Sequence, residues 1–216
     1  MCEVIILTIL PDLTQTEFDA LLRLVAPKKQ ERIRRYHFYR DAQNSLLGDI
    51  LIRSEICRIT RFNKEKLDFS TNEYDKPFLT NCPDVQFNIS HTGHYVACAV
   101  ANKPVGIDIE SIKPVDLIIA KRFFAPDETE YIMNGNQTRR FFEIWTKKES
   151  RIKWEGKGLS KPLPSFSVFN PIELEELAYH EVFQNEEVIC HVCLCDKNKP
   201  SIRHINTKEL LSELEM

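Results

Sequence analysis

Val105-Gly106-Ile107-Asp108-Ile109-Glu110 is the stretch of this 216-residue chain that decides how its second half folds. Apolar residues alternate with small or acidic ones, which is the period of two that a β-strand requires. In a strand Asp108 and Glu110 project from one face, and Ile107 and Ile109 from the other. Two neighbouring carboxylates in an apolar run are costly to bury without a cation, and a hard ion such as Mg²⁺ meets that need. The spacing alone fits a strand with a solvated acidic face as well.

The composition is that of a folded globular protein. Hydrophobic residues make up 43% of the chain and charged residues 28%, which argues against disorder. A net charge of −3 gives no basic surface, so nucleic-acid binding is not expected. The opening run Val4-Ile5-Ile6-Leu7 is too short for a membrane span or a signal sequence. We therefore expect no membrane association, a cytoplasmic location and reduced cysteines.

Three of the seven cysteines lie close together, with His191 beside them, and have to be tested as a zinc site. The segment 187–195 has the pattern of a β-strand. In a strand Cys193 and Cys195 share one face while Cys190 takes the other, and no second pair follows at zinc-finger spacing. We therefore predict a structural strand and assign no metal to it.

Hydrophobic periodicity divides the chain at Asn102-Lys103-Pro104. Helices are predicted from Thr14 or Thr16 to Val25, and at 42–61, 116–123, 126–133 and 139–154. Strands are predicted at 3–9, 67–70, 87–90, 95–101, 105–110, 166–169, 177–183 and 187–195. The fold class is therefore α+β, with two similar halves at residues 1–103 and 104–216. The acids of the second half lie near the junction, and sites tend to occupy such clefts.

A second charged segment, Trp145-Thr146-Lys147-Lys148-Glu149-Ser150-Arg151-Ile152-Lys153, lies in the last predicted helix. Glu149 and Lys153 have the spacing of a favourable ion pair. Taken alone, the segment fits a solvated charged face. A carboxylate from this helix could also complete the Mg²⁺ shell begun by Asp108 and Glu110, and the lysines could hold phosphate oxygens as point charges.

Three motifs, in this order, resemble those of the 4′-phosphopantetheinyl transferases. They are Asn88-Ile89-Ser90-His91-Thr92, Val105–Glu110 and Trp145-x-x-Lys148-Glu149-Ser150-x-x-Lys153. Phe123-Phe124, Gly156-Lys157-Gly158-Leu159-Ser160 and Ser165-Phe166-Ser167-Val168 are similar to the surfactin-type branch, which serves nonribosomal peptide synthetases. The resemblance extends from about Pro27 to Val168 and so covers most of the chain.

The resemblance implies a pseudo-twofold pair of α+β halves in one monomeric chain, with coenzyme A held in the active-site cleft between them. It implies transfer of 4′-phosphopantetheine from coenzyme A to a serine of an apo peptidyl or acyl carrier protein, releasing adenosine 3′,5′-bisphosphate. Asp108, Glu110 and Glu149 match the family's ligands for Mg²⁺, with Mn²⁺ as the alternative ion. Glu149 is also the candidate general base, directly or through a metal-bound water, and Lys153 matches the lysine that contacts phosphate.

The resemblance also implies a set of residues that bind coenzyme A: Lys29, Arg32, Lys76, Pro77, Ser90, His91, Thr92, Lys148, Lys153 and Lys157. Two positions depart from the family pattern. Asp75 replaces the glycine of a Gly-Lys-Pro turn, but aspartate tolerates left-handed backbone geometry, so the turn can form. Asn44 stands where the family often has arginine, and the lost charge predicts weaker coenzyme A binding than in a relative with arginine.

Three alternatives stay open at this level. Glu128 fits a family pattern that follows Phe124, but an acid at a helix N-terminus has the same appearance. Small and apolar residues after Trp154, including Leu159, Pro162 and Pro164, match a carrier-binding region or an ordinary loop. A coenzyme A- or carrier-binding module without catalysis is the alternative to an active enzyme, although all three acids are present.

Overall fold

A computed structural model describes residues 1–63, 66–158, 161–170 and 177–214 of the chain. The helices are α1 (Gln15–Leu22), α2 (Pro27–Arg34), α3 (Tyr39–Thr60), α4 (Ile118–Phe123), α5 (Pro126–Met133), α6 (Gln137–Glu155) and α7 (Thr207–Leu214), with a 3₁₀ turn, η3, at Leu163–Ser165. The strands are β1 (Cys2–Thr8), β2 (Phe69–Thr71), β3 (Pro77–Leu79), β4 (Gln86–Thr92), β5 (Tyr95–Ala101), β6 (Val105–Ser111), β7 (Leu177–Gln184), β8 (Val188–Cys195) and β9 (Ser201–Asn206).

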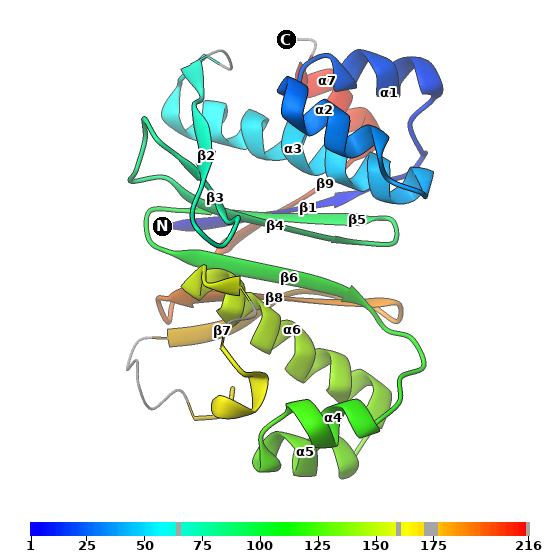
Figure 1. The fold of residues 1–216 in the computed structure, drawn as a ribbon, viewed down its shortest axis with the longest axis vertical. Coiled ribbons are helices and arrows are strands. Elements are labelled where there is room, and N and C mark those ends of the chain that lie inside the picture. Colours follow the sequence, from blue (N-terminus) through cyan, green and yellow to red (C-terminus); the bar gives the residue numbers. More distant parts are fainter. Residues whose placement is uncertain (64–65, 159–160, 171–176, 215–216) are drawn as a thin grey trace.

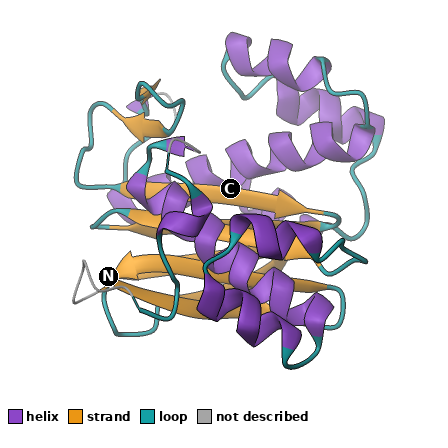
Figure 2. Cartoon of the chain, turned by 60° about the horizontal axis from the view of Figure 1, so that its bottom comes forward, coloured by secondary structure: helices purple, strands orange, loops and turns teal. Residues whose placement is uncertain are grey.

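Most of these elements form four layers, in which the two larger sheets lie between two groups of helices (Figure 1). β2 and β3 pair with each other as a separate two-stranded sheet. The first sheet has the strand order β4-β5-β1-β9, and the second has the order β6-β8-β7. Helices α1, α2, α3 and α7 cover the first sheet, and α4, α5 and α6 cover the second. A view turned by 60° shows helices on both sides of the strands (Figure 2). The predicted α+β class with two halves is confirmed.

Alternation along β1 explains why the sheets are buried on both faces. Ile5 and Leu7 enter the core beneath the first group of helices, while Val4 and Ile6 enter the core between the two sheets. β5 follows the same rule, with alanines on the inter-sheet side. Strands buried on both faces read as continuous apolar runs, which is how these two segments appear in the sequence.

The last strand of the chain joins the sheet of the first half. β9 pairs in parallel with β1 from Glu3↔Ser201 to Thr8↔Asn206, and α7 contacts β9. Residues 201–214, at the end of the predicted unit 104–216, therefore lie with the first sheet in space. The sequence did not reveal β9 because it lies at the edge of that sheet and Ile202 is exposed, which leaves a weak apolar pattern.

Most of the predicted elements are confirmed with small shifts of their ends. Thr14 caps α1 in a capping box with Glu17, and the predicted cysteine-rich strand is β8. The strand predicted at 166–169 is wrong, since these residues follow η3 without forming one. Buried side chains of α5 and α6 bind their main-chain groups instead, as the next subsection describes.

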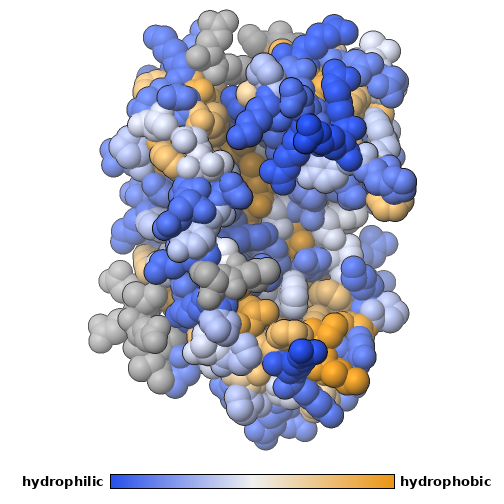
Figure 3. Space-filling view, viewed as in Figure 1, coloured by the Kyte–Doolittle hydropathy of each residue, from blue (hydrophilic) through white to orange (hydrophobic). Residues whose placement is uncertain are grey.

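Surface composition varies over the face seen in Figure 3, which is mostly hydrophilic. Apolar side chains gather in its lower part, over α4. There Ile118 is 66% exposed and Phe123 is 40% exposed. Within the described residues, no helix combines the length and apolar character that crossing a membrane requires.

Candidate active site

The close approach of α6 to β6 builds the site. The apolar face of β6 is buried between the sheets, so Asp108 and Glu110 face α6. A Cβ atom on Gly106 would lie 2.0 Å from the main-chain oxygen of Ser150 and 2.3 Å from the main-chain nitrogen of Trp154. Glycine alone allows this approach, because it has no Cβ. The contact places Glu149 beside the two strand acids.

A cavity of about 400 Å³ lies where β4, β6 and α6 meet. Its lining residues are Ile89, Ser90, His91, Asp108, Glu110, Trp145, Glu149 and Lys153. Six of these are predicted site residues, namely Ser90, His91, Asp108, Glu110, Glu149 and Lys153. The prediction that Asp108 and Glu110 share one face of a strand is confirmed. Trp145 and Ile89 stand in the quoted motifs but had no predicted role, because neither carries a charge.

Asp108 is held by one of its two carboxylate oxygens. Lys153 Nζ lies 2.6 Å from Asp108 Oδ1, and the Ser90 hydroxyl donates to the same oxygen at 3.0 Å. The other oxygen, Oδ2, is buried and has no hydrogen-bond partner among the described residues. A buried carboxylate oxygen without a partner is costly, so this atom marks a place for a cation or a ligand donor.

Glu110 and Glu149 have too little positive charge nearby to offset their burial and the charge of Asp108. Burial and the neighbouring Asp108 raise the pKa of Glu110 to about 7, while Lys153 and a hydrogen bond from the Trp145 side chain oppose the shift. Burial and Asp108 also raise the pKa of Glu149. Both shifts have the cause expected for carboxylates that share one site. A bound cation would relieve that repulsion.

The acids do not form a coordination shell in this geometry. Among the residues that the structure describes, no group of three or more His, Cys, Asp or Glu side chains is placed to hold a metal ion. The chemistry of the donors nevertheless suits one. Three carboxylates line a single cavity, one of them carries the unpaired Oδ2, and hard oxygen donors are what Mg²⁺ prefers.

Side chains of β4 join this strand to β6, although the two are edge strands of different sheets. Oxygen atoms of Asn88, Ser90 and Thr92 accept the main-chain N–H groups of Ile107, Ile109 and Ser111 at 2.9, 3.3 and 3.2 Å. We call this row the β4–β6 seam. It satisfies polar groups along an edge that would otherwise be open. The sequence did not predict it, because pairing between two sheets leaves no local pattern.

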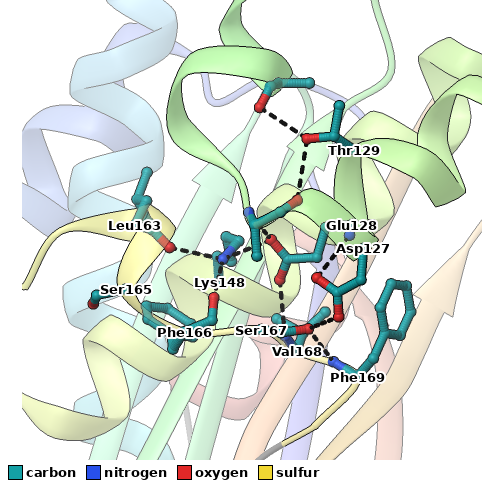
Figure 4. A network of polar contacts seen from close by, with 12 residues as sticks. Asp127, Glu128, Thr129, Lys148, Leu163, Ser165, Phe166, Ser167, Val168 and Phe169 are labelled. Carbon is teal, nitrogen blue, oxygen red and sulfur yellow. Dashed lines mark hydrogen bonds and ion pairs between the residues drawn. The ribbon is translucent and has the colours of Figure 1, made fainter.

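Lys148 does not lie at the cavity. Its side chain is fully buried on another face of α6 (Figure 4), with Nζ 2.8 Å from Glu128 Oε2. Nζ also donates to the carbonyl oxygens of Leu163 and Phe166 at 2.8 and 2.6 Å. We therefore remove Lys148 from the predicted coenzyme A-binding set. Helix geometry could have excluded it, because consecutive residues do not share a face.

Glu128 is the acid at the N-terminus of α5, which is the simpler of its two interpretations. Its carboxylate accepts the N–H groups of Ala125 and Val168, each at 2.8 Å. Together with Lys148 it fixes the segment after η3 to α5 and α6 (Figure 4). This network satisfies main-chain groups that a strand would otherwise pair, which explains why residues 166–169 form none.

Lys76 clamps the C-terminal end of α6 from the β2–β3 turn. Its Nζ donates to the carbonyl oxygens of Val105, Lys153 and Trp154 at 3.2, 2.5 and 3.4 Å, and burial lowers its pKa to about 8. The turn forms with Asp75 at a φ of 63°, as its tolerance of left-handed geometry predicted. Lys76 does not line the cavity, so its contact with the nucleotide stays a prediction.

The remaining predicted coenzyme A-binding residues lie outside the cavity lining. They are Lys29 and Arg32 on α2, Pro77 on β3, Thr92 at the end of β4 and Lys157 after α6.

Partial burial and Lys153 lower the pKa of His91, with a smaller effect in the same direction from Lys29. Asn44 is 1% exposed and donates to the Gly93 carbonyl oxygen at 3.0 Å. Leu159 and Ser160 lie outside the described residues.

Comparison with known proteins covers both halves of the chain. Residues 12–103 match the family model "4′-phosphopantetheinyl transferase, N-terminal", and residues 104–209 match "4′-phosphopantetheinyl transferase superfamily". The chain is 47% identical over 159 residues to 4′-phosphopantetheinyl transferase Sfp of Bacillus subtilis, covering 72% of this chain and 71% of that protein.

Two further relatives give the same result. The chain is 41% identical over 171 residues to 4′-phosphopantetheinyl transferase gsp of Aneurinibacillus migulanus, covering 77% of this chain and 70% of that one. It is 32% identical over 163 residues to the mouse L-aminoadipate-semialdehyde dehydrogenase-phosphopantetheinyl transferase, covering 68% of this chain and 53% of that one. With family models over both halves and relatives of this identity, the chain belongs to the 4′-phosphopantetheinyl transferase superfamily.

Proposed function

We propose that this protein transfers 4′-phosphopantetheine from coenzyme A to a serine hydroxyl of an apo carrier protein, with Mg²⁺ as the metal and Mn²⁺ as a substitute. The observation that carries the proposal is the cavity in which acids of β6 and α6 meet Lys153 and His91. Phosphoryl transfer depends on alignment and charge neutralisation more than on covalent chemistry from the protein. Because all three acids line the cavity in a chain of this family, an inactive binding module is not supported.

We propose different roles for the residues of the cavity according to their chemistry. Asp108, Glu110 and Glu149 would hold the metal ion, which when bound would neutralise charge on the pyrophosphate of coenzyme A. Lys153 and His91 would hold phosphate oxygens. Glu149, whose pKa is raised by burial, would accept the proton of the carrier serine. The serine oxygen then forms its bond to phosphorus, and the bond to adenosine 3′,5′-bisphosphate breaks.

The carrier surface that we propose combines α4 with the segment around η3. Ile118 and Phe123 of α4 are exposed, α4 contacts η3, and Pro162 and Pro164 are exposed beside it. Lys121 and Arg122 in the last turn of α4 add positive charge. An apolar patch with a polar rim is typical of a protein-binding surface. We propose peptidyl carrier domains of nonribosomal peptide synthetases as the partners, which makes antibiotic biosynthesis the setting.

We also propose that the enzyme works as a cytoplasmic monomer. The cavity takes its lining from β4 of the first half and from β6 and α6 of the second, so one chain supplies both sides. The domain organisation that we propose divides the chain between residues 103 and 104. β9 and α7 then return to the sheet of the first half.

The decisive experiment is to mix the protein with coenzyme A, Mg²⁺ and an apo carrier domain, and to follow the carrier by mass spectrometry. We expect the phosphopantetheine mass increment, its loss on chelation of the metal, and its return with Mg²⁺ or Mn²⁺. Asp108→Ala and Glu149→Ala should each lower the rate at least about 100-fold, because each removes charge stabilisation at the reacting groups.

Asp84→Ala, which changes an exposed acid before β4 that does not line the cavity, is the matched control and should transfer normally. Near-normal transfer by Asp108→Ala or Glu149→Ala would remove that residue from the site. Binding of coenzyme A or of the carrier without a mass increment would instead favour a binding module.

A further inference from the structure

We propose that Ser90 is a positioning residue, whose hydroxyl orients Asp108 and Lys153 across the β4–β6 seam, and that it does not bind coenzyme A. The inference rests on the proposed function, since it gives the hydroxyl a task within that site. It changes the role that the family resemblance implies for Ser90.

The first argument is the hydrogen-bonding capacity of the hydroxyl. A serine hydroxyl has one proton to donate and two lone pairs that accept. The proton goes to Asp108 Oδ1 at 3.0 Å, and the lone pairs receive the Ile109 N–H at 3.3 Å and Lys153 Nζ at 3.0 Å. A phosphate oxygen needs a donor, and Ser90 has already used its proton. To contact phosphate it would have to release Asp108.

The second argument is what these bonds do to Asp108. Ser90 and Lys153 both donate to Oδ1, which fixes the orientation of the carboxylate. Oδ2 is then the oxygen without a partner among the described residues, and it is the one that a cation can take. Partners of this kind, bound to a metal ligand rather than to the metal, set the orientation and the basicity of the ligand.

The third argument is the contrast with the other two bonds of the seam. Asn88 accepts the Ile107 N–H, and Thr92 contacts the N–H and the hydroxyl of Ser111. In the contacts described for them, neither touches an acid of the cavity. The seam therefore joins the two sheets along its whole length, and at Ser90 it also reaches the reacting groups.

Replacing Ser90 distinguishes a positioning role from direct binding of coenzyme A. Ser90→Ala leaves Oδ1 without its hydroxyl donor and frees the Asp108 carboxylate to rotate. We expect Mn²⁺ to bind about 10- to 100-fold more weakly, as for other partners of metal ligands, and kcat to fall in parallel. The KM for coenzyme A, measured with the metal ion in excess, should stay within about twofold, because Lys153 keeps its ion pair with Asp108 and no contact with substrate is lost.

The measurement is Mn²⁺ binding by electron paramagnetic resonance, without coenzyme A, beside steady-state transfer kinetics. Ser90→Thr keeps a hydroxyl and should retain most of the Mn²⁺ affinity. Asn88→Ala removes a bond of the same seam away from the acids, so it should lower the melting temperature while leaving Mn²⁺ affinity unchanged. Ser90→Cys keeps the size of the side chain with much weaker hydrogen bonding and should behave as Ser90→Ala does, which provides the test if the alanine variant is unstable.

The outcomes distinguish this inference from the function on which it rests. A raised KM for coenzyme A with unchanged kcat and Mn²⁺ affinity in Ser90→Ala would overturn it in favour of direct binding. Equal loss of Mn²⁺ affinity in Asn88→Ala would overturn it in favour of general support by the seam. If the unchanged protein neither bound Mn²⁺ nor transferred phosphopantetheine, the proposed function itself would fail and this inference with it.

Discussion

At position 106 the absence of one methyl group sets the distance between β6 and α6. The three nearest atoms that a Cβ would meet all belong to the main chain of α6, so no side chain can rotate away to make room. The helix as a whole would have to move. Because α6 carries Glu149 and Lys153, the geometry of the cavity depends on this one glycine.

We predict that Gly106→Ala lowers the free energy of unfolding by about 3 kcal/mol, the upper range for overpacking, and abolishes most of the transfer activity. Urea denaturation and the carrier assay measure the two effects. Gly48→Ala is the control, because its Cβ would meet a side-chain methyl of Ile89 at 3.2 Å, and it should cost little. Wild-type stability and activity in Gly106→Ala would show that α6 does not depend on this contact.

Single residues also show how much of the site could be predicted from the sequence. The strand period predicted that Asp108 and Glu110 face the same way, and the motif order predicted that Glu149 and Lys153 join them. The role of Ser90 could not be predicted, since its partners lie on another sheet and on a distant helix. Lys148 was misplaced by its position in a motif, although a helix turns about 100° between neighbours.

At the scale of elements, a buried ion pair fixes α6 to its neighbours. Lys148 and Glu128 have fully buried side chains 2.8 Å apart, and the ring of Phe166 lies 4.2 Å from Lys148 Nζ. Such a pair is costly to break, because removing one partner leaves an uncompensated buried charge. The pair connects α5, α6 and the segment after η3, and so it supports the elements that form the proposed carrier surface.

Lys148→Met should therefore cost about 3–5 kcal/mol of stability, while Lys148→Met combined with Glu128→Leu should cost less than the sum of the two single changes. The folded fraction should keep its KM for coenzyme A. Lys147→Met provides the control, because its pair with Glu143 is more exposed and is worth at most about 0.5 kcal/mol. A raised KM without loss of stability would return Lys148 to the coenzyme A site.

At the scale of the whole molecule, Arg203 connects the last strand to the first half. Its guanidinium bonds the fully buried Glu55 of α3 and lies 2.7 Å from Glu213 of α7. The sequence did not predict this network, since isolated charges in a half-exposed strand resemble ordinary surface. The network ties residues near the end of the second predicted half to α3 of the first half. The two predicted halves are therefore not two separate continuous segments of the chain.

We predict that Arg203→Met lowers stability by about 2 kcal/mol, the range for a hydrogen bond to a charged group, and that the whole chain then unfolds earlier. Trp145 and Trp154 are the two tryptophans and both lie in the second half. Their fluorescence midpoint in urea should therefore shift together with the circular dichroism midpoint. A shift in circular dichroism alone would indicate that the halves unfold separately.

The return of β9 to the first sheet has a consequence for synthesis on the ribosome. β1 is synthesised well before β9, and the two are neighbours in the finished sheet. During translation one edge of β1 has no partner, although its residues Val4–Leu7 are fully buried in the final protein. An unpaired apolar edge invites association with other chains. The nascent polypeptide therefore exposes an unpaired apolar strand until β9 emerges from the ribosome, and a chaperone that shields this strand during translation should raise the yield of folded enzyme.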